Sequence, residues 1–371
     1  LLSKDLLDKY NKALTKRNKY KNKIISITGT CGKTTLSNLL KNALSTTYVV
    51  EKTWNNSNSI KGIPWCINND LNLNSDFWII EVGISKKNEM KLLLDLVQPD
   101  IRIITNVGIA HSDNFENEKE YQKEKLVYLK NLSQNTVVII DNDDPILHTY
   151  NYPKNIHVIR CGSNLDSDVI LQKYTFNHLT LTSNISIKTK KGVISFTTTV
   201  IGKHLSKLMC LVTACCLYLN VPLEKLPHIF QNFKYCENRG NIIKKNKITI
   251  FNYSYNANPT SFEANLLLFK EIKHKNKIII IGDMLKINKQ NAYFHHKEIY
   301  KKCLQITKNI CIFTEVFKQI VVNEDLPYLF MENNIDSLGV QVSNYIKLSK
   351  NCAIFIQGCN NTNINKILKY L

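Results

Sequence analysis

Short apolar runs alternate with amphipathic, helix-like segments along the first part of the chain. The runs occupy residues 24–28, 77–82, 101–105, 136–140 and 156–160, and residues 36–44 have the apolar spacing of a helix. Buried strands that alternate with helices are typical of a parallel sheet with crossover helices. We therefore expect a central, mostly parallel α/β domain over residues 23–236.

The pattern changes after residue 168, where a meander of short strands rich in Thr, Ile and Val covers residues 169–200. Helical segments follow at residues 206–219 and 223–233. A second alternating series then has strands at residues 248–252, 277–281, 310–313 and 353–357 and helices at residues 261–272 and 294–303. This series predicts a second, Rossmann-like α/β domain over residues 237–371, while residues 1–22 have the pattern of a linker with one short amphipathic helix.

Residues 28–35, Thr-Gly-Thr-Cys-Gly-Lys-Thr-Thr, join the first predicted strand to the first predicted helix. A glycine turn at this place directs backbone N–H groups and the positive end of the helix at a phosphate, the lysine reaches the outer phosphates, and the threonine hydroxyl can bind Mg²⁺. Ile27 replaces the first glycine of the longer Walker pattern. The sequence thus predicts a P-loop-type nucleotide site made by Gly29, Thr30, Cys31, Gly32, Lys33, Thr34 and Thr35.

Two more polar groups follow predicted strands. Glu81 ends an apolar run, and a carboxylate at the carboxyl end of a parallel strand can hold Mg²⁺ near the phosphates. His111 follows a strand and a glycine turn, where ligation and a structural role are both open. Further on, Tyr121-Gln122-Lys123-Glu124-Lys125 begins a helix, in which surface Lys–Glu alternation is the simplest interpretation.

Composition narrows the class of protein. The net charge is +19, but the lysines are scattered and interleaved with asparagines, without the clustering of a nucleic-acid-binding module, so we expect anionic substrates and no nucleic acid. The 11 cysteines form no Cys-x-x-Cys pair, which predicts free thiols in a reducing compartment. Neither a membrane-spanning run nor a signal peptide is present, so we expect no membrane partner and a cytoplasmic protein, or one in the equivalent compartment of an organelle or symbiont. We also expect a monomer. The absent initiator Met suggests a processed or trimmed chain.

Several separate motifs resemble the Mur ligase family in order and spacing: residues 28–35, Glu81-Val82-Gly83, residues 106–111, Asn142-Asp143-Asp144-Pro145 and Gly202-x-His204. Residues 254–261, Gly282-Asp283-Met284-Leu285 and residues 55–64 resemble the branch that adds D-alanyl-D-alanine. The resemblance implies an ATP-dependent acid–amino-acid ligase of peptidoglycan precursor synthesis that works through an acyl phosphate. It implies ATP and Mg²⁺ as cofactors and UDP-MurNAc-tripeptide and D-Ala-D-Ala as substrates.

The resemblance also implies residue roles. Lys33, Lys125 and His111 would be catalytic, and Mg²⁺ would be held by Thr34, Glu81, His111 and Lys125, the lysine as a carbamate. Lys123 is the nearby rival to Lys125, two residues short of the family spacing. Arg239, Asn258 and Pro259 would contact the nucleotide, and His296 matches a histidine to which we assign no role.

The chain also departs from the family pattern. The substrate domain that usually precedes the phosphate loop is not found upstream of residue 23, and Cys31, Leu208, Asn252-Tyr253 and residues 357–360 replace the usual residues. These departures leave two alternatives to a D-alanyl-D-alanine-adding enzyme. One is a degenerate homologue that binds nucleotide or a partner without ligating, and the other is a different Mur-type ligase, similar to folylpolyglutamate synthase.

Overall fold

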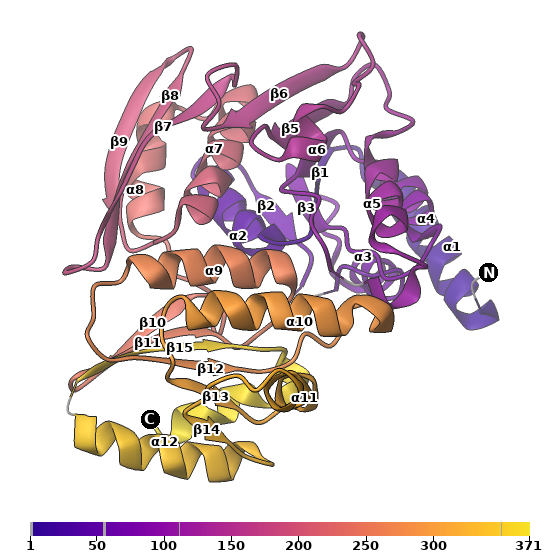
Figure 1. Ribbon diagram of the computed structural model, residues 1–371. Coiled ribbons are helices and arrows are strands. Elements are labelled where there is room, and N and C mark those ends of the chain that lie inside the picture. Colours follow the sequence, from indigo (N-terminus) through magenta and orange to yellow (C-terminus); the bar gives the residue numbers. More distant parts are fainter. Residues whose placement is uncertain (1–2, 55–56, 111, 350) are drawn as a thin grey trace. The chain divides into compact units, whose positions relative to one another are not determined.

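The computed structural model describes residues 3–54, 57–110, 112–349 and 351–371. It divides into two compact units, the first formed by Leu1–Ile109 and Asn114–Phe233 and the second by Ala110–Asp113 and Lys234–Leu371 (Figure 1). The boundary expected between residues 236 and 237 lies close to this division.

The first unit is built on one nine-stranded sheet in the order β2-β3-β1-β4-β5-β6-β7-β8-β9. Its strands are β1 (Lys23–Thr28), β2 (Val50–Lys52), β3 (Phe77–Glu81), β4 (Ile101–Ile104), β5 (Val137–Asp141), β6 (His157–Gly162), β7 (Val169–Asn177), β8 (Thr182–Thr189) and β9 (Gly192–Thr198). Neighbours from β2 to β7 pair in parallel, and β8 and β9 pair antiparallel. The expected mostly parallel sheet is confirmed, and the meander continues that sheet.

Helices cover both faces of this sheet. They are α1 (Lys4–Lys19), α2 (Lys33–Leu44), α3 (Gly62–Asp70), α4 (Glu89–Val97), α5 (Glu118–Leu126), α6 (Pro145–His148), α7 (Lys203–Tyr218) and α8 (Leu226–Gln231), with short 3-10 turns at Ser112–Asn114, Val127–Leu129 and Leu223–Lys225. One core joins α1, α3 and α4 to alternate residues of the central strands, such as Ile24, Trp78 and Ile80. Since side chains alternate along a strand, Ile25 and Ile27 face the other side, where α2 and α7 pack.

Residues 1–22, expected to form a linker with one short amphipathic helix, contain the 16-residue helix α1. Helix α1 packs beside α4, as Figure 1 shows, and the Tyr10 hydroxyl donates a 2.8 Å hydrogen bond to Leu92 O. Arg17 Nε donates to Val97 O at 2.7 Å, which satisfies a carbonyl at the end of α4. The apolar stripe of α1 is therefore the inner face of a docked helix.

The second unit has a six-stranded sheet in the order β10-β11-β15-β12-β13-β14. Its strands are β10 (Asn241–Lys245), β11 (Ile248–Tyr253), β12 (Lys277–Ile281), β13 (Ile310–Ile312), β14 (Phe330–Met331) and β15 (Cys352–Gln357), all parallel to their neighbours except β10. Its helices are α9 (Pro259–Glu271), α10 (Lys289–Leu304), α11 (Glu315–Asn323) and α12 (Ile335–Ser349), followed by 3-10 turns at Asn360–Thr362 and Ile364–Lys369. Helix α12 covers one face of the sheet, and α9 and α10 cover the other (Figure 1).

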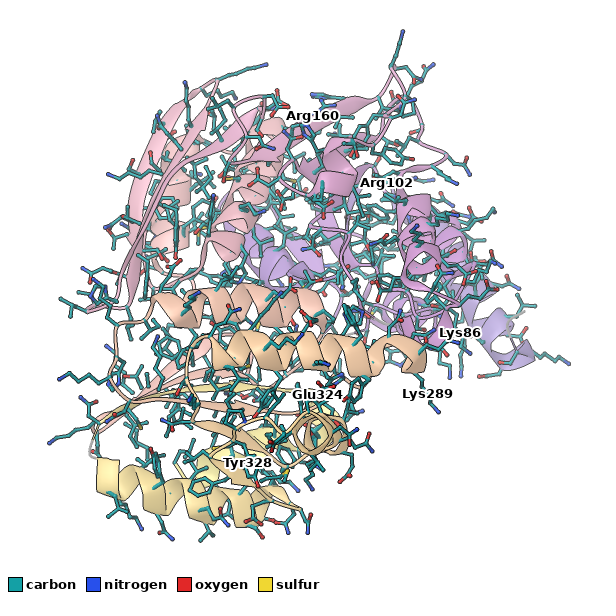
Figure 2. All side chains as sticks on the ribbon, in the orientation of Figure 1. Lys86, Arg102, Arg160, Lys289, Glu324 and Tyr328 are labelled. Carbon is teal, nitrogen blue, oxygen red and sulfur yellow. The ribbon has the colours of Figure 1, made fainter. Side chains whose placement is uncertain are left out.

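Charged side chains cover the surface of each unit, and the exposed Lys86 and Lys289 are examples labelled in Figure 2. All 11 cysteines are free thiols. Within the residues that the structure describes, no helix has the length and apolar character needed to cross a bilayer.

Candidate active site

The phosphate loop lies between the end of β1 and the start of α2, as the sequence predicts. Two of its glycines have a positive φ, +142° at Gly29 and +85° at Gly32, which caps α2. A Cβ at Gly29 would lie 1.9 Å from Thr105 Oγ1, so only glycine fits against the end of β4. The loop therefore depends on both the backbone freedom and the small size of Gly29.

Residues that follow β4 hold the loop in place. Asn106 Oδ1 accepts hydrogen bonds from the backbone N–H groups of Thr30 (3.1 Å) and Cys31 (3.0 Å). Thr105 Oγ1 donates to Cys31 O at 2.6 Å. These hydrogen bonds hold the loop at positions 30 and 31, directly before α2, which begins at Lys33. The sequence motif at residues 106–111 contains Asn106 but does not reveal this role, which depends on a contact across 75 positions.

The expected metal-binding groups Thr34 and Glu81 lie in contact. Thr34 Oγ1 donates to Glu81 Oε2 at 2.9 Å, and Ser37 Oγ donates to Glu81 Oε1 at 2.8 Å. Glu81 is fully buried at the end of β3. A carboxylate and a hydroxyl are hard oxygen donors of the kind that Mg²⁺ prefers, so this pair fits the ion beside the phosphates.

Two lysines, Lys33 and Lys125, belong to the site. Lys33 Nζ donates to Gly29 O at 2.7 Å, which folds the side chain back over the loop. Lys125 is fully buried, with Nζ 5.1 Å from the centre of the Tyr121 ring. Burial, and then the positive charge of Lys33, hold the pKa of Lys125 well below its ordinary value. A buried amine with a lowered pKa is in its neutral form far more often than a surface lysine.

The structure distinguishes Lys125 from its rival. Lys123 is exposed on the outer side of α5, whereas Lys125 lies inside, close enough to Lys33 for the two charges to interact. Tyr121, one turn earlier, forms a side-chain hydrogen bond with Thr30 of the loop. The expected third ligand, His111, lies outside the described residues. Elsewhere in the described chain, no three His, Cys, Asp or Glu side chains form a metal site.

A buried polar cluster lies at the end of β5. Lys207 Nζ lies 2.8 Å from Asp141 Oδ2 and 3.6 Å from Asp143 Oδ2. His204, from the same helix as Lys207, is half-buried, and its loss of water contact together with the charge of Lys207 lowers its pKa to about 4. One turn further, the Leu208 side chain would lie 3.2 Å from a Cβ at Gly32. Leu208, which departs from the family pattern, thus packs directly on the phosphate loop.

In the second unit, three motif-bearing loops converge beyond the carboxyl ends of β11, β12 and β15. A Cβ at Gly358 would lie 3.1 Å from Gly282 Cα, so these two loops cross at glycines. Asn258 begins α9 with a capping box that it shares with Ser261, and Pro259 occupies the first turn. The expected nucleotide residues Asn258 and Pro259 therefore have a structural role as a helix start.

Two further residues of this unit have defined partners. The Arg239 guanidinium lies 3.7 Å from the centre of the Tyr255 ring, a cation–π contact. His296 Nδ1 lies 2.7 Å from Ala292 O, and Nε2 accepts a 2.9 Å hydrogen bond from Met284 N. This geometry requires a neutral ring protonated on Nδ1. His296, to which the sequence assigned no role, therefore positions the Gly-Asp-Met-Leu loop.

The altered residue Gln357 is fully buried at the end of β15. It donates through Nε2 to Ser261 Oγ at 3.1 Å and accepts from Asn265 Nδ2 at 3.1 Å. Asp283 accepts hydrogen bonds from Thr314 Oγ1 at 2.8 Å and from the backbone N–H of Val316 at 3.0 Å, which caps α11. The side chains of Gln357 and Asp283 therefore hold loops and helix starts of this unit in place.

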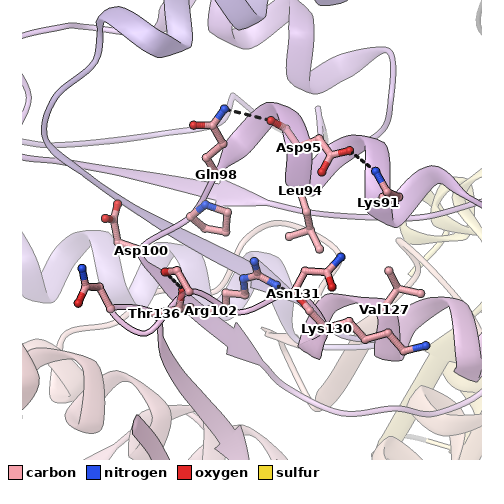
Figure 3. Close-up of a pocket in the computed structure, with 13 residues that line it drawn as sticks. Lys91, Leu94, Asp95, Gln98, Asp100, Arg102, Val127, Lys130, Asn131 and Thr136 are labelled. Carbon is pink, nitrogen blue, oxygen red and sulfur yellow. Dashed lines mark hydrogen bonds and ion pairs between the residues drawn. The ribbon is translucent and has the colours of Figure 1, made fainter. Parts of the chain in front are cut away.

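A pocket of about 420 Å³ lies at the opposite edge of the first sheet, where β4 and β5 begin. Figure 3 shows Lys91, Asp95, Arg102 and Lys130 around it. Arg102 donates to the carbonyls of Tyr128 (2.6 Å) and Lys130 (3.1 Å), which end a 3-10 turn. The phosphate loop follows the carboxyl end of β1, so this pocket is separate from the candidate site.

Comparison with known proteins gives a family match. The Mur ligase middle domain matches residues 27–216, just over half of the 371 residues. The UDP-N-acetylmuramoyl-tripeptide–D-alanyl-D-alanine ligase of Bacillus subtilis is 28% identical over 278 residues, which cover 74% of this chain and 58% of that protein. The enzyme of the same name from Borreliella burgdorferi is 28% identical over 316 residues, which cover 82% of this chain and 65% of that protein. The match thus spans less than two thirds of each relative.

Solved structures share the fold. MurF from Acinetobacter baumannii superimposes with a TM-score of 0.89 at 19% identity, covering 100% of this chain and 81% of that one. MurF ligase from Thermotoga maritima, in complex with ADP, gives a TM-score of 0.88 at 18% identity, covering 100% of this chain and 84% of that one. The expected fold class is therefore confirmed.

Proposed function

The chain belongs to the Mur ligase family, and we propose that it is an ATP-dependent ligase that joins D-Ala-D-Ala to UDP-MurNAc-tripeptide in peptidoglycan precursor synthesis. The names of its relatives support this assignment. The observation that carries it is the contact between Thr34 and Glu81 at 2.9 Å beside the phosphate loop, because these oxygens suit the Mg²⁺ of a nucleotide.

The proposed reaction has two steps. The tripeptide carboxylate attacks the γ-phosphorus of ATP and releases ADP, and the amine of D-Ala-D-Ala then attacks the acyl carbon and releases phosphate. Lys33 would neutralise charge on the transferring phosphoryl group, and the first turn of α2 would bind the phosphates. Mg²⁺, when bound, supplies further charge neutralisation, and Thr34, Glu81, His111 and Lys125 would hold it.

Lys125 would act as a carbamate. Its neutral amine would add to CO₂ and lose a proton, which converts the buried amine into an anionic, carboxylate-like oxygen ligand. Full burial and the lowered pKa of Lys125 support this role, since only a neutral amine is nucleophilic. The family resemblance supports Arg239, Asn258 and Pro259 as further nucleotide contacts. We place this activity in the cytoplasm or an equivalent compartment and assign it to a monomer.

The decisive experiment measures phosphate and ADP release. We expect release that depends on ATP, UDP-MurNAc-tripeptide and D-Ala-D-Ala together. Lys125→Ala should abolish ligation and be partly rescued by short carboxylic acids, whereas the exposed Lys123→Ala should behave like the unsubstituted protein. ATP binding without turnover would contradict the proposal and favour a homologue that binds nucleotide without ligating.

A further inference from the structure

Two tryptophans form an exposed pair in the first unit. Trp54 follows β2 and is 62% exposed, and Trp65 lies on α3 and is 49% exposed. Their ring centroids are 6.4 Å apart, with the planes tilted by 46°. Large aromatic side chains bury much of their surface in folded proteins, and exposed pairs of them mark binding surfaces.

Hydrogen bonds attach two residues near Trp54 in the sequence, Thr53 and Asn58, to the residues around Glu81. Thr53, directly before Trp54, donates its N–H to Ile79 O at 2.9 Å and accepts Glu81 N–H on its Oγ1 at 3.3 Å. Gly83 N donates to Asn58 O at 2.7 Å, and a Cβ at Gly83 would lie 2.9 Å from Asn58 Oδ1. Thr53 and Asn58 are therefore fixed against the residues on both sides of Glu81.

The order of strands in the sheet sets the distance between the backbone at Trp54 and the phosphate loop. Strands β2, β3 and β1 are neighbours and parallel, so Trp54, Glu81 and the loop follow three adjacent strand ends. Adjacent strands are about 4.8 Å apart, which places the backbone at Trp54 about 10 Å from the loop. Three residues of extended peptide also span about 10 Å. On the other side of the loop, Asn106 is occupied in holding the loop.

We propose that Trp54 and Trp65 form a stacking subsite for the muramyl sugar of the acceptor substrate. This inference rests on the proposed function. With the tripeptide carboxylate beside Glu81, the three-residue stem reaches along the strand ends to β2, where its sugar-bearing end meets the tryptophans. A pyranose ring presents apolar C–H groups on its flat face and hydroxyls at its rim, which suits an indole surface open to water.

Tryptophan fluorescence tests the contact directly. The chain has 3 tryptophans, and Trp78 is fully buried, so ligand-induced changes in emission arise from Trp54 and Trp65. We expect MurNAc-tripeptide to change the emission saturably, while UDP and the free tripeptide leave it unchanged. In the Trp54→Phe and Trp65→Phe double variant the change should vanish. An equal change with the free tripeptide would overturn the sugar assignment in favour of the peptide stem.

Kinetics provide the second measurement. Trp54→Ala should raise the KM for UDP-MurNAc-tripeptide about tenfold through the lost aromatic contact, with kcat and the KM for ATP retained. Leu179→Ala, which alters a side chain 82% exposed on the β7–β8 turn, is the matched control and should change none of these values. Turnover with an unchanged KM in both Trp54→Ala and Trp65→Ala would overturn the subsite alone. An emission change with MurNAc-tripeptide in a protein that shows no turnover would support the subsite and contradict the proposed function.

Discussion

The Thr34 hydroxyl donates a 2.9 Å hydrogen bond to the buried carboxylate of Glu81 and so joins the first turn of α2 to the end of β3. Ser37 binds the second carboxylate oxygen at 2.8 Å. These two hydrogen bonds hold the negative charge of Glu81 beside the phosphate loop and give both carboxylate oxygens a partner inside the protein. Glu81, the proposed metal ligand, is therefore held in position by two hydroxyl groups of α2.

The substitution Glu81→Gln removes the negative charge of the side chain and keeps its size and shape. The amide can still bond to both hydroxyls, so we expect little change in the unfolding midpoint. The lost negative charge should weaken Mg²⁺-dependent ATP binding by about tenfold or more, measured by calorimetry with and without Mg²⁺. Ser37→Ala is the control: it should cost about 1 kcal/mol of unfolding free energy and keep the Mg²⁺ dependence. Equal Mg²⁺ dependence in Glu81→Gln would contradict the metal role.

Gly29→Ala should abolish nucleotide binding, because the new Cβ would lie 1.9 Å from Thr105 Oγ1 and displace the loop. Gly192→Ala is a matched control, since Gly192 has a similar φ of +136° but its nearest neighbour, Leu223, is 3.8 Å from the added Cβ. Both changes impose backbone strain and only the first imposes a collision. ATP binding by Gly29→Ala as strong as that of Gly192→Ala would refute the crowding argument.

The lowered pKa of His204 predicts that the unfolding free energy falls in acid. Its pKa is about 4 in the folded protein because of burial and the charge of Lys207, and about 6.5 in an unfolded chain. Between these values the unfolded state binds a proton that the folded state does not. The unfolding free energy should therefore fall as the pH drops below 6.5, by on the order of 2 kcal/mol at pH 5, and this term is absent above pH 6.5.

Urea unfolding followed by tryptophan emission measures this effect, since all 3 tryptophans belong to the first unit. His204→Gln should flatten the dependence between pH 7 and pH 5, whereas His228→Gln, at an exposed position of the same unit, should leave it as it is. A pH dependence of equal slope in both variants would show that His204 is not its source.

Substitutions of Asn258 separate its effect on the stability of the fold from any effect on nucleotide binding. Its side chain accepts a hydrogen bond from Ser261 N at 2.9 Å and caps α9. Asn258→Ala should lower the unfolding free energy by about 1 kcal/mol, and Asn258→Ser should restore the cap. If Asn258 also lines the adenosine, Asn258→Ser will bind ATP more weakly at full stability. Unchanged ATP affinity in the serine variant would limit Asn258 to its capping role.

The local sequence pattern does not determine which of Lys123 and Lys125 is buried. Both residues lie in one helix with alternating charge, and only the family spacing favours Lys125. Packing of Tyr121 and Lys125 against the phosphate loop makes one lysine buried and leaves the other exposed. Burial of this kind depends on which surface of the helix meets the sheet, which a short charged helix does not specify.

The features predicted correctly from the sequence are those encoded in short windows. The apolar runs of the strands, the glycine turn before α2 and the position of Glu81 all follow from local spacing. The edge strands β2, β10 and β14 escaped prediction because edge strands bury less apolar surface and have weaker patterns.

Contacts between distant segments came only from the folded chain. Asn106 holds the loop at Cys31 across 75 positions, and α1 docks through Arg17 onto a carbonyl 80 positions away. Parallel pairing of β2 with β3 brings Thr53, directly before Trp54, to Glu81, and the fold brings the Trp65 ring of α3 within 6.4 Å of the Trp54 ring. Such pairings depend on the packing of the whole sheet, so no local pattern contains them.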